Sequence, residues 1–389
     1  MNDSSRIFWF DLVRGVSALI VCAGHLRNVV FCDVGEIVAP VAWHWPFYFL
    51  TSLGHQAVMV FFVLSGFFVG GSVLRNRCRF SWGNYWLARL SRLWVVLVPA
   101  LLFTVLADSI TNSFSPETFQ GSFRETWNSG PSLDTYSASS VTFGANLLFL
   151  QTVIAPVYGS NGPLWSLAYE FWYYALFPVF VGLVFPRFRM MSVVLAVLAA
   201  ALLILLPSEI LYAGGGWMLG VLVYLLRDVR WISGKRMLFV VVCSFATLFL
   251  ASLCASKSQP LNAILPIGGD AAVGATFAIL ALFLLQVESW FPQFLKRGVK
   301  WLSDISYTLY LFHFPIVVFV GGVVLRGKQV QPKLLSLVMY LLCLVAIVAI
   351  CHLFWFAFER NTPGVRKWCK SKIVRLNLVA GASVDGNAN

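Results

Sequence analysis

Long apolar stretches recur from one end of the chain to the other. Most are about as long as a helix that crosses a bilayer, which needs roughly 20 apolar residues. Because all backbone groups must be hydrogen-bonded in lipid, repeated stretches of this length predict helices and not an open sheet. The pattern therefore predicts an all-α polytopic membrane protein, a bundle of about ten transmembrane helices. The expected spans are 7–31, 46–73, 84–107, 163–185, 190–206, 209–226, 236–255, 270–289, 303–325 and 334–358.

One apolar segment, near 141–156, is too short for an ordinary crossing. If it does not cross and both termini are cytoplasmic, most of the 28 basic residues fall on the cytoplasmic side, as the positive-inside rule requires. We therefore expect a short re-entrant or interfacial segment here. The long polar loop 108–140 should then lie outside the cytoplasm.

Composition narrows the class of protein. The chain of 389 residues is 59% hydrophobic and only 11% charged, which excludes a disordered chain, a disulfide scaffold and a soluble enzyme with a single anchor. The net charge of +12 would suggest nucleic acid in a soluble protein, but here the basic residues cluster in short breaks between apolar stretches. The expected partner of these charges is membrane lipid, and no nucleic acid is expected. The eight cysteines lie singly, as small buried side chains do.

Ionisable residues inside the membrane cost several kcal/mol and therefore indicate function. Arg14 and His25 lie eleven residues apart in the first span, which places them about 20° apart around a helix with a rise of roughly 16 Å. They share one face at two depths. Arg14 could instead be an interfacial residue that reaches for water, and His25 a hydrogen-bonded structural histidine.

The second and third spans carry weaker signals. Ser65 precedes glycines at 66 and 70, whose spacing is explained better by close helix packing than by a ligand. Arg89 and Arg92 stand three residues apart at the start of the next span. They are either positive-inside anchors or a fork for an anionic ligand.

Two later segments add polar groups. Glu170 lies one helical turn after Ser166 among aromatic residues, where it either orients a catalytic histidine or anchors helix packing. A second set falls within roughly an 80° arc of one helix face and forms either a hydrogen-bond ladder or a ligand site. Its members are Ser303, Ser306, Tyr310 and His313.

Taken in order, these elements resemble the acyltransferase-3 family of integral membrane O-acyltransferases, which modify cell-surface carbohydrates. The resemblance covers residues 5 to 360, and its ordered set is more specific than any one motif. It consists of Asp11-Leu-Val-Arg14-Gly15 with His25, FFVLSGF at 61–67, Arg89-x-x-Arg92, WSLAYE at 165–170 and SYTLYLFHFP at 306–315. Many relatives also carry an extracytoplasmic SGNH-type domain. None is expected here, where residues 1–360 form the transmembrane domain and 361–389 a basic cytoplasmic tail, disordered at its end.

The resemblance implies transfer of an acyl group, usually acetyl from acetyl-CoA, to a hydroxyl of an envelope carbohydrate such as O-antigen, exopolysaccharide or a lipid-linked saccharide. It also implies a bacterial cytoplasmic (inner) membrane. No metal is expected, because no ligand spacing for one occurs on any span.

Such a transfer needs a base, oxyanion stabilisation and a grip on the anionic donor. We expect His25 to deprotonate the acceptor, with Glu170 or a serine of the 303–313 face fixing its tautomer. A covalent acyl-histidine intermediate is equally compatible with these residues. The residues expected to bind the donor are Arg14, Arg89, Arg92, Ser65, Ser306, Tyr310 and His313.

The competing interpretation is a proton-coupled transporter or flippase for a lipid-linked sugar. In that case His25, Glu170 and His313 would form a proton relay, and Arg14 would hold the substrate. The ordered motif set and the absence of a detectable internal repeat argue against it.

Overall fold

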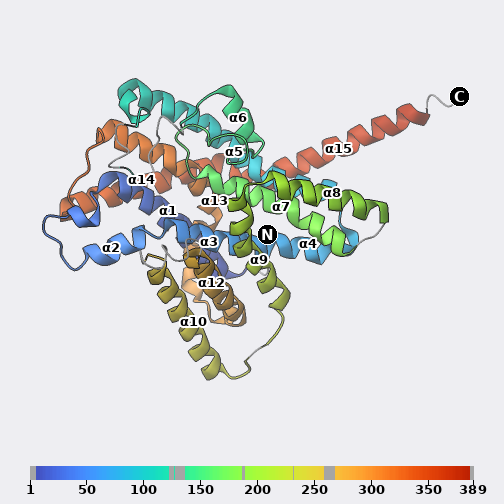
Figure 1. Cartoon of the computed structure of the whole chain (residues 1–389), viewed down its shortest axis with the longest axis horizontal. Coiled ribbons are helices and arrows are strands. Elements are labelled where there is room, and N and C mark those ends of the chain that lie inside the picture. Colours follow the sequence, from blue (N-terminus) through green and yellow to red (C-terminus); the bar gives the residue numbers. More distant parts are fainter. Residues whose placement is uncertain are drawn as a thin grey trace.

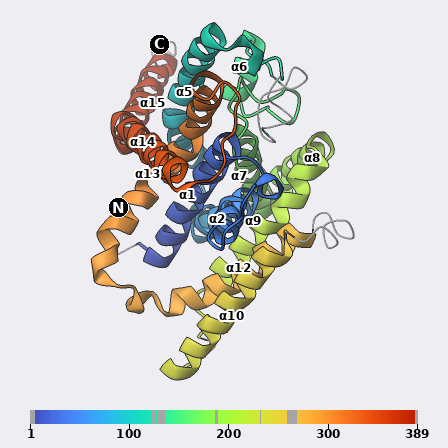
Figure 2. The same ribbon diagram turned by 90° about the vertical axis from the view of Figure 1, so that its left-hand side faces the viewer.

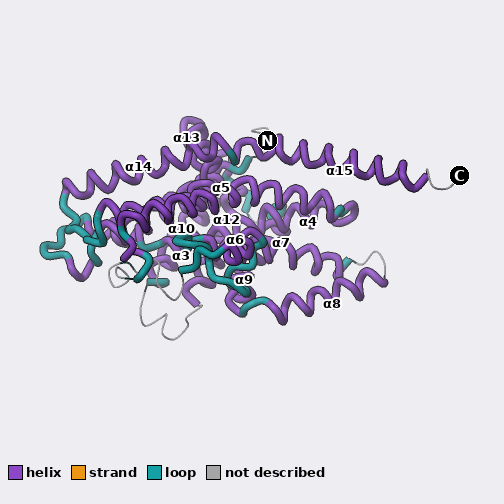
Figure 3. Tube along the Cα trace, turned by 90° about the horizontal axis from the view of Figure 1, so that it is seen from above, coloured by secondary structure: helices purple, strands orange, loops and turns teal. Residues whose placement is uncertain are grey.

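The computed structural model describes residues 6–121, 127, 136–185, 189–230, 232–257 and 268–385. Within these ranges the protein is built from helices joined by loops, with isolated bridges in place of any sheet (Figures 1 and 3). The longer helices are α1 (Phe8–Val30), α2 (His44–Thr51), α3 (Gly54–Ser65), α5 (Trp82–Phe114), α6 (Ser140–Leu147), α7 (Leu164–Val184), α8 (Arg189–Leu205), α9 (Ser208–Leu226), α10 (Lys235–Ala255), α12 (Gly268–Gln286), α13 (Lys296–Phe319), α14 (Leu334–Ala357) and α15 (Thr362–Asp385).

The helix lengths confirm an all-α polytopic membrane protein. Among the described residues, nine helices are long and apolar enough to cross a membrane. The tenth expected span, 190–206, is α8, whose apolar part Val194–Leu205 is shorter than the other nine. The segment 141–156 contains only the eight-residue α6, which rises about 12 Å and does not cross. It is therefore too short to span a membrane, as its length predicted.

Two predicted boundaries were wrong. The expected span 46–73 is divided, because α2 ends at Thr51 and the chain turns before α3 begins. The turn packs against α1, where a Cβ on Gly24 would collide with the Thr51 carbonyl oxygen. The third span does not end at 107 but continues to Phe114.

The longer α5 removes Asp108 from the polar loop to which the sequence assigned it. Asp108 is buried, and its carboxylate accepts hydrogen bonds from the Ser160 backbone nitrogen (2.8 Å) and the Ser160 hydroxyl (2.6 Å). This pairing fixes the loop before α7 against α5. The acidic side chain of Asp108 therefore did not indicate that this part of the chain is exposed to solvent.

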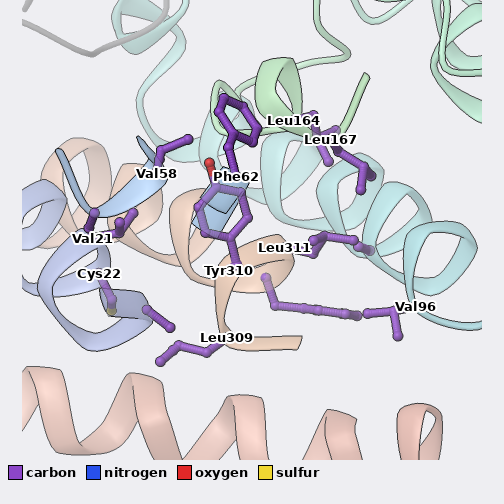
Figure 4. Packing of buried hydrophobic residues seen from close by; sticks show 14 of the residues in the cluster. Val21, Cys22, Val58, Phe62, Val96, Leu164, Leu167, Leu309, Tyr310 and Leu311 are labelled. Carbon is purple, nitrogen blue, oxygen red and sulfur yellow. The ribbon is translucent and has the colours of Figure 1, made fainter. Parts of the chain in front are cut away.

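Helices α1 and α13 run side by side through the middle of the bundle, both in the same direction along the chain (Figure 2). The main core is formed by side chains from α1, α3, α5, α7 and α13, with Tyr310 of α13 among the labelled residues in Figure 4. Around this core, α10 is the least covered of the long helices before α14, with 17% of its apolar window buried. The centre of the bundle is thus made of the helices that carry the sequence motifs.

A short π-helical segment, Gly66–Gly70, interrupts the span between α3 and α4 (Gly71–Asn76). A Cβ on Gly66 would collide with the Trp217 carbonyl oxygen, and one on Gly220 would collide with the Val63 carbonyl oxygen. The glycine spacing at 66 and 70 therefore does serve close helix packing. The partner is α9.

The two ends of the bundle differ in charge. The end where α1, α5 and α13 begin is called the basic end. Helix α4 also ends there, next to Arg75, Arg77 and Arg79. The opposite end is where α3, α7, α9 and α12 begin. Helix α15 extends from the basic end, away from the bundle (Figure 1). It continues to Asp385, through most of the tail for which composition predicted disorder, and 386–389 lie outside the described residues.

Candidate active site

Arg14 holds α1 against α13 near the basic end. Its Nε donates to the Ser303 hydroxyl at 3.0 Å, and its Nη2 donates both to the same hydroxyl and to the Ser303 carbonyl oxygen. The Ser303 hydroxyl donates in turn to Asp11 at 2.6 Å, one turn before Arg14 on α1. The Arg14 side chain is 23% exposed, so its partners hold it in place while part of it remains accessible. It is an anchored guanidinium and not a free interfacial one.

Arg6 extends this network beyond the first turn of α1. It pairs with Asp11 at 3.1 Å and with Asp304 at 2.6 Å. Burial alone would lower the pKa of Arg6, but hydrogen bonding and charge attraction from Asp304 and Asp11 raise it above its usual value. Two arginines and two aspartates therefore lie together at the junction of α1 and α13, where side chains of opposite sign face each other.

His25 and His313 come together further along the same pair of helices. Their ring centroids are 5.4 Å apart with a 31° angle between the planes, and Phe314 meets the His25 ring edge-on at 4.7 Å. His25 is partly exposed, whereas His313 is completely buried. Helical spacing brought Arg14 and His25 to one face in the prediction, and α13 supplies a partner for each.

The hydrogen bonds of His313 define which nitrogen carries its proton. Nδ1 lies 2.8 Å from the Leu309 carbonyl oxygen, which can only accept, so Nδ1 is the donor. The neutral ring then presents a lone pair at Nε2, and this buried atom has no hydrogen-bond partner among the described residues. A buried acceptor of this kind is costly unless a ligand or water satisfies it.

The polar face predicted along α13 exists and divides its contacts between neighbouring helices. The Tyr310 hydroxyl lies 2.7 Å from the Ser166 hydroxyl of α7. The Ser306 hydroxyl donates to the Ser303 carbonyl oxygen within α13. Ser303 and His313 face α1, as described above. The face is a hydrogen-bonded ladder at Ser303 and Ser306. Further along α13, Tyr310 adjoins the histidine pair, with its ring centroid 6.1 Å from that of His313.

Ser65 and Glu170 meet at the start of the π-helical segment. The Ser65 hydroxyl donates to Glu170 at 2.8 Å and accepts from the Trp217 indole at 3.2 Å. Tyr174 also donates to Glu170. The sequence predicted that Glu170, or a serine of the 303–313 face, fixes the tautomer of His25; the described hydrogen bonds of Glu170 connect it to Ser65 and Tyr174. Segments of π-helix often mark functional sites, and here one follows a serine bonded to a partly buried carboxylate.

Arg89 and Arg92 lie on α5 and face this group. The Arg89 guanidinium lies 5.8 Å from the Tyr174 ring and 5.6 Å from the Tyr85 ring. Arg92 is exposed but interacts electrostatically with Glu359, Tyr174, Glu170 and Tyr307. It also repels Arg14 across the bundle. The three arginines therefore converge on one solvent-accessible region near the basic end.

Glu359 was missed by the sequence analysis. It lies just after α14 and accepts from the Thr308 backbone nitrogen at 3.2 Å and from the Thr308 hydroxyl at 2.5 Å. Both Arg92 and Arg14 interact with its charge. The signal was weak, because Glu359 precedes Arg360 in a basic tail and looked like part of a solvated segment. Among the described residues, no three His, Cys, Asp or Glu side chains are grouped to hold a metal.

The geometry offers two kinds of chemistry along α1 and the helices that pack near it, α5 and α13. Near the basic end, Arg14, Arg89 and Arg92 can bind an anion through forked hydrogen bonds. About 16 Å further along α1, the pair of His25 and His313 can accept and return a proton. A long molecule with an anionic head and a reactive tail would reach both.

Comparison with known proteins adds an independent line of support. The family model described as "Acyltransferase domain", Acyl_transf_3, matches residues 7–356. Over 328 residues, 72% of this chain and 47% of the relative, the sequence is 26% identical to the putative peptidoglycan O-acetyltransferase YrhL of Bacillus subtilis. It is 24% identical over 342 residues to the O-acetyltransferase OatA of Staphylococcus aureus, 77% of this chain and 51% of OatA.

A third relative matches over its greater part. The acyltransferase MdmB of Streptomyces mycarofaciens is 26% identical over 364 residues, 87% of each chain. The chain thus spans about half the length of YrhL and OatA and most of MdmB. No solved structure matches the chain.

Proposed function

The chain belongs to the acyltransferase-3 family, and from this premise we propose that it transfers an acyl group, acetyl from acetyl-CoA, to a hydroxyl of an envelope carbohydrate. The carbohydrate we have in mind is an O-antigen, an exopolysaccharide or a lipid-linked saccharide. Support for an O-acyltransferase comes from the family match over 7–356 and from relatives named as O-acetyltransferases. The observation that carries the proposal is the histidine pair at one depth of α1 and the anchored Arg14 at another.

We place the basic end of the bundle in the cytoplasm of a bacterium, with the protein in its inner membrane. Clusters of arginine and lysine favour the cytoplasmic side of a membrane. Acetyl-CoA is made in the cytoplasm and carries several phosphate charges, so it would approach from this end. The opposite end would then face the carbohydrate.

The three arginines are proposed to hold the donor. Arg89 and Arg92 would bind its phosphates, because guanidinium binds phosphate through two parallel hydrogen bonds. Arg14 lies deeper and would meet the donor where it enters the bundle. Glu170, bonded to Ser65 and Tyr174, attracts the Arg92 guanidinium electrostatically. We therefore propose Glu170 as a positioning residue of the donor site in place of its expected role beside His25.

His25 is proposed as the general base. It would take the proton from the acceptor hydroxyl as the oxygen attacks the thioester carbonyl. Collapse of the tetrahedral intermediate breaks the carbon–sulfur bond, and the protonated His25 returns its proton to the departing thiolate. The buried Nε2 of His313 would accept a hydrogen bond from a bound substrate and so fix the group that reacts. Tyr310 and Ser306 would line the same path.

The first test is release of free thiol from acetyl-CoA by the protein purified in detergent, with and without envelope glycans. We expect turnover in the wild type and loss of at least about a hundredfold in His25→Ala, the usual scale for a general base. His352→Ala is the matched control, since His352 lies on α14 and contacts Trp301 and Trp355.

Equal activity in His25→Ala and His352→Ala would remove His25 as the base. Thiol release from no acyl-CoA by the wild type would contradict the proposed function itself and leave the transporter as the better interpretation.

A further inference from the structure

Aromatic and ionisable side chains gather at the opposite end of the bundle, outside the donor site described above. They come from the beginnings of four helices, α3, α7, α9 and α12. The members of this group, which we call the outer cluster, are His55, Trp165, Tyr169, Glu209 and Asp270. The sequence analysis gave no role to His55, Glu209 or Asp270, and Trp165 and Tyr169 entered it only as parts of a motif.

His55 and Trp165 form a stacked pair, and a hydrogen bond between His55 and Asp270 holds the imidazole in place. The two ring centroids are 5.9 Å apart with an angle of 21° between the planes. The His55 Nε2 lies 2.8 Å from the Asp270 carboxylate. The His55 side chain is 51% exposed and that of Asp270 is 27% exposed. An oriented imidazole and a carboxylate therefore lie at the surface, next to an indole that is only partly covered.

The neighbouring aromatic rings fix the orientation of Trp165. Tyr169 meets it edge-on at 5.0 Å, and Phe62 packs behind both rings at 6.4 and 6.3 Å. The exposed Glu209 of α9 interacts electrostatically with Tyr169. Aromatic residues at a membrane interface commonly anchor helices, but anchoring requires neither a carboxylate-bonded imidazole stacked on the indole nor acidic groups from two other helices.

The outer cluster lies next to the proposed catalytic pair. Ser166, the residue after Trp165, is hydrogen-bonded to Tyr310, which is one turn from His313 on α13. Gly54, the residue before His55, is positioned so that a Cβ would contact the Val21 backbone at 3.9 Å. Val21 lies one turn before His25 on α1. A molecule bound at the outer cluster could therefore extend a hydroxyl toward His25.

We propose that the outer cluster binds a saccharide ring of the acceptor, an inference that rests on the proposed function. A sugar ring has an apolar face of C–H groups, which suits the indole of Trp165, and a rim of hydroxyls, which are donors. Asp270 and Glu209 offer acceptors for those donors from two sides. The acidic groups disfavour an anionic ligand, so the donor would be excluded here and kept at the arginines of the basic end.

The test is binding of methyl glycosides to the full chain in detergent, measured by saturation-transfer NMR. The probes are methyl β-D-glucoside, methyl N-acetyl-β-D-glucosaminide and methyl α-L-rhamnoside. Trp165→Leu removes the indole while keeping an apolar side chain. Trp45→Leu is the matched control, because Trp45 is a 59% exposed tryptophan on α2, outside the outer cluster.

We expect at least one glycoside to bind the wild type and Trp45→Leu equally, and to bind Trp165→Leu about tenfold more weakly. His55→Gln, which removes the imidazole that stacks on Trp165 and bonds to Asp270, should weaken binding in the same direction. Binding of none of the glycosides by the wild type, or equal binding by Trp165→Leu and Trp45→Leu, would overturn the proposal.

Thiol release from acetyl-CoA by the wild type, measured with envelope glycans present, separates this inference from the proposed function. Normal thiol release with glycoside binding that does not depend on Trp165 would refute the outer cluster alone. Glycoside binding that depends on Trp165, in a wild type that releases no thiol, would instead refute the acyltransferase function and leave a sugar-binding membrane protein.

Discussion

Single residues at this site are fixed by partners from distant parts of the chain. Arg14 is the clearest case, since both Ser303 and Asp11 define the direction of its guanidinium. A side chain held in this way loses little conformational entropy when it binds an anion. Its geometry, as well as its charge, should therefore determine affinity for the donor.

Arg14→Lys should raise the KM for acetyl-CoA about tenfold, equivalent to about 1.4 kcal/mol, because a lysine keeps the charge but loses the fork that binds Ser303 and an anion together. The measurement is initial rate against acetyl-CoA concentration. Arg360→Lys is the control, since Arg360 is exposed and lies over the Phe356 ring. An unchanged KM in Arg14→Lys would assign Arg14 to joining α1 and α13 alone.

The residue scale also shows where sequence reasoning reached its limit. Helical periodicity placed Arg14 and His25 on one face, because both lie on one element and obey its geometry. It could not supply His313 as the partner of His25, or Glu359 as the partner of Arg92, because those contacts depend on how helices far apart in the sequence pack. It also directed Glu170 toward His25, whereas the packing of α7 against α3 brings it to Ser65.

At the scale of elements, the close crossing of α3 and α9 depends on glycines, which have no side chain to separate the two helices. Gly66 and Gly220 each face a backbone carbonyl of the other helix. The crossing brings Trp217 to Ser65 and so completes the hydrogen bonds around Glu170. Disturbing the crossing should affect stability first and the donor site second.

Two substitutions on α9 should act in opposite directions. Gly220→Ala should destabilise the protein by about 1–3 kcal/mol, because its Cβ would collide with the Val63 carbonyl and separate the helices. Gly216→Ala, one turn earlier with open space around it, should be neutral or stabilising by up to about 1 kcal/mol, as alanine is the better helix former. Thermal unfolding of the two variants in detergent makes the comparison. Equal effects would show that the crossing is not tightly packed.

At the scale of the whole molecule, the approximate number of spans and the short segment at 141–156 could be predicted. Both depend on the length and apolarity of segments, which the sequence contains directly. The division of 46–73 into α2 and α3 could not be predicted, because it depends on the contact between Gly24 and Thr51. The extension of α5 was missed for a related reason. The sequence predicts Asp108 in a loop, whereas in the structure Ser160 donates two hydrogen bonds to its carboxylate.

The proposed orientation of the whole bundle can be tested with cysteines. Cys78 is exposed at the basic end, whereas Val38, in the loop between α1 and α2, is 85% exposed at the other end. The buried Cys22, Cys32 and Cys351 can remain, since they should not react, while Cys243, Cys254, Cys343 and Cys369 are replaced by serine. One variant carries Val38→Cys and lacks Cys78, and a membrane-impermeant maleimide should label it in intact cells. The other variant retains Cys78, and the same reagent should label it only after the membrane is opened. The positive-inside rule requires this order, because the arginines beside Cys78 are retained on the cytoplasmic side. Labelling of Cys78 in intact cells would place the arginines of the donor site on the side that lacks acetyl-CoA, and the proposed direction of transfer would be wrong.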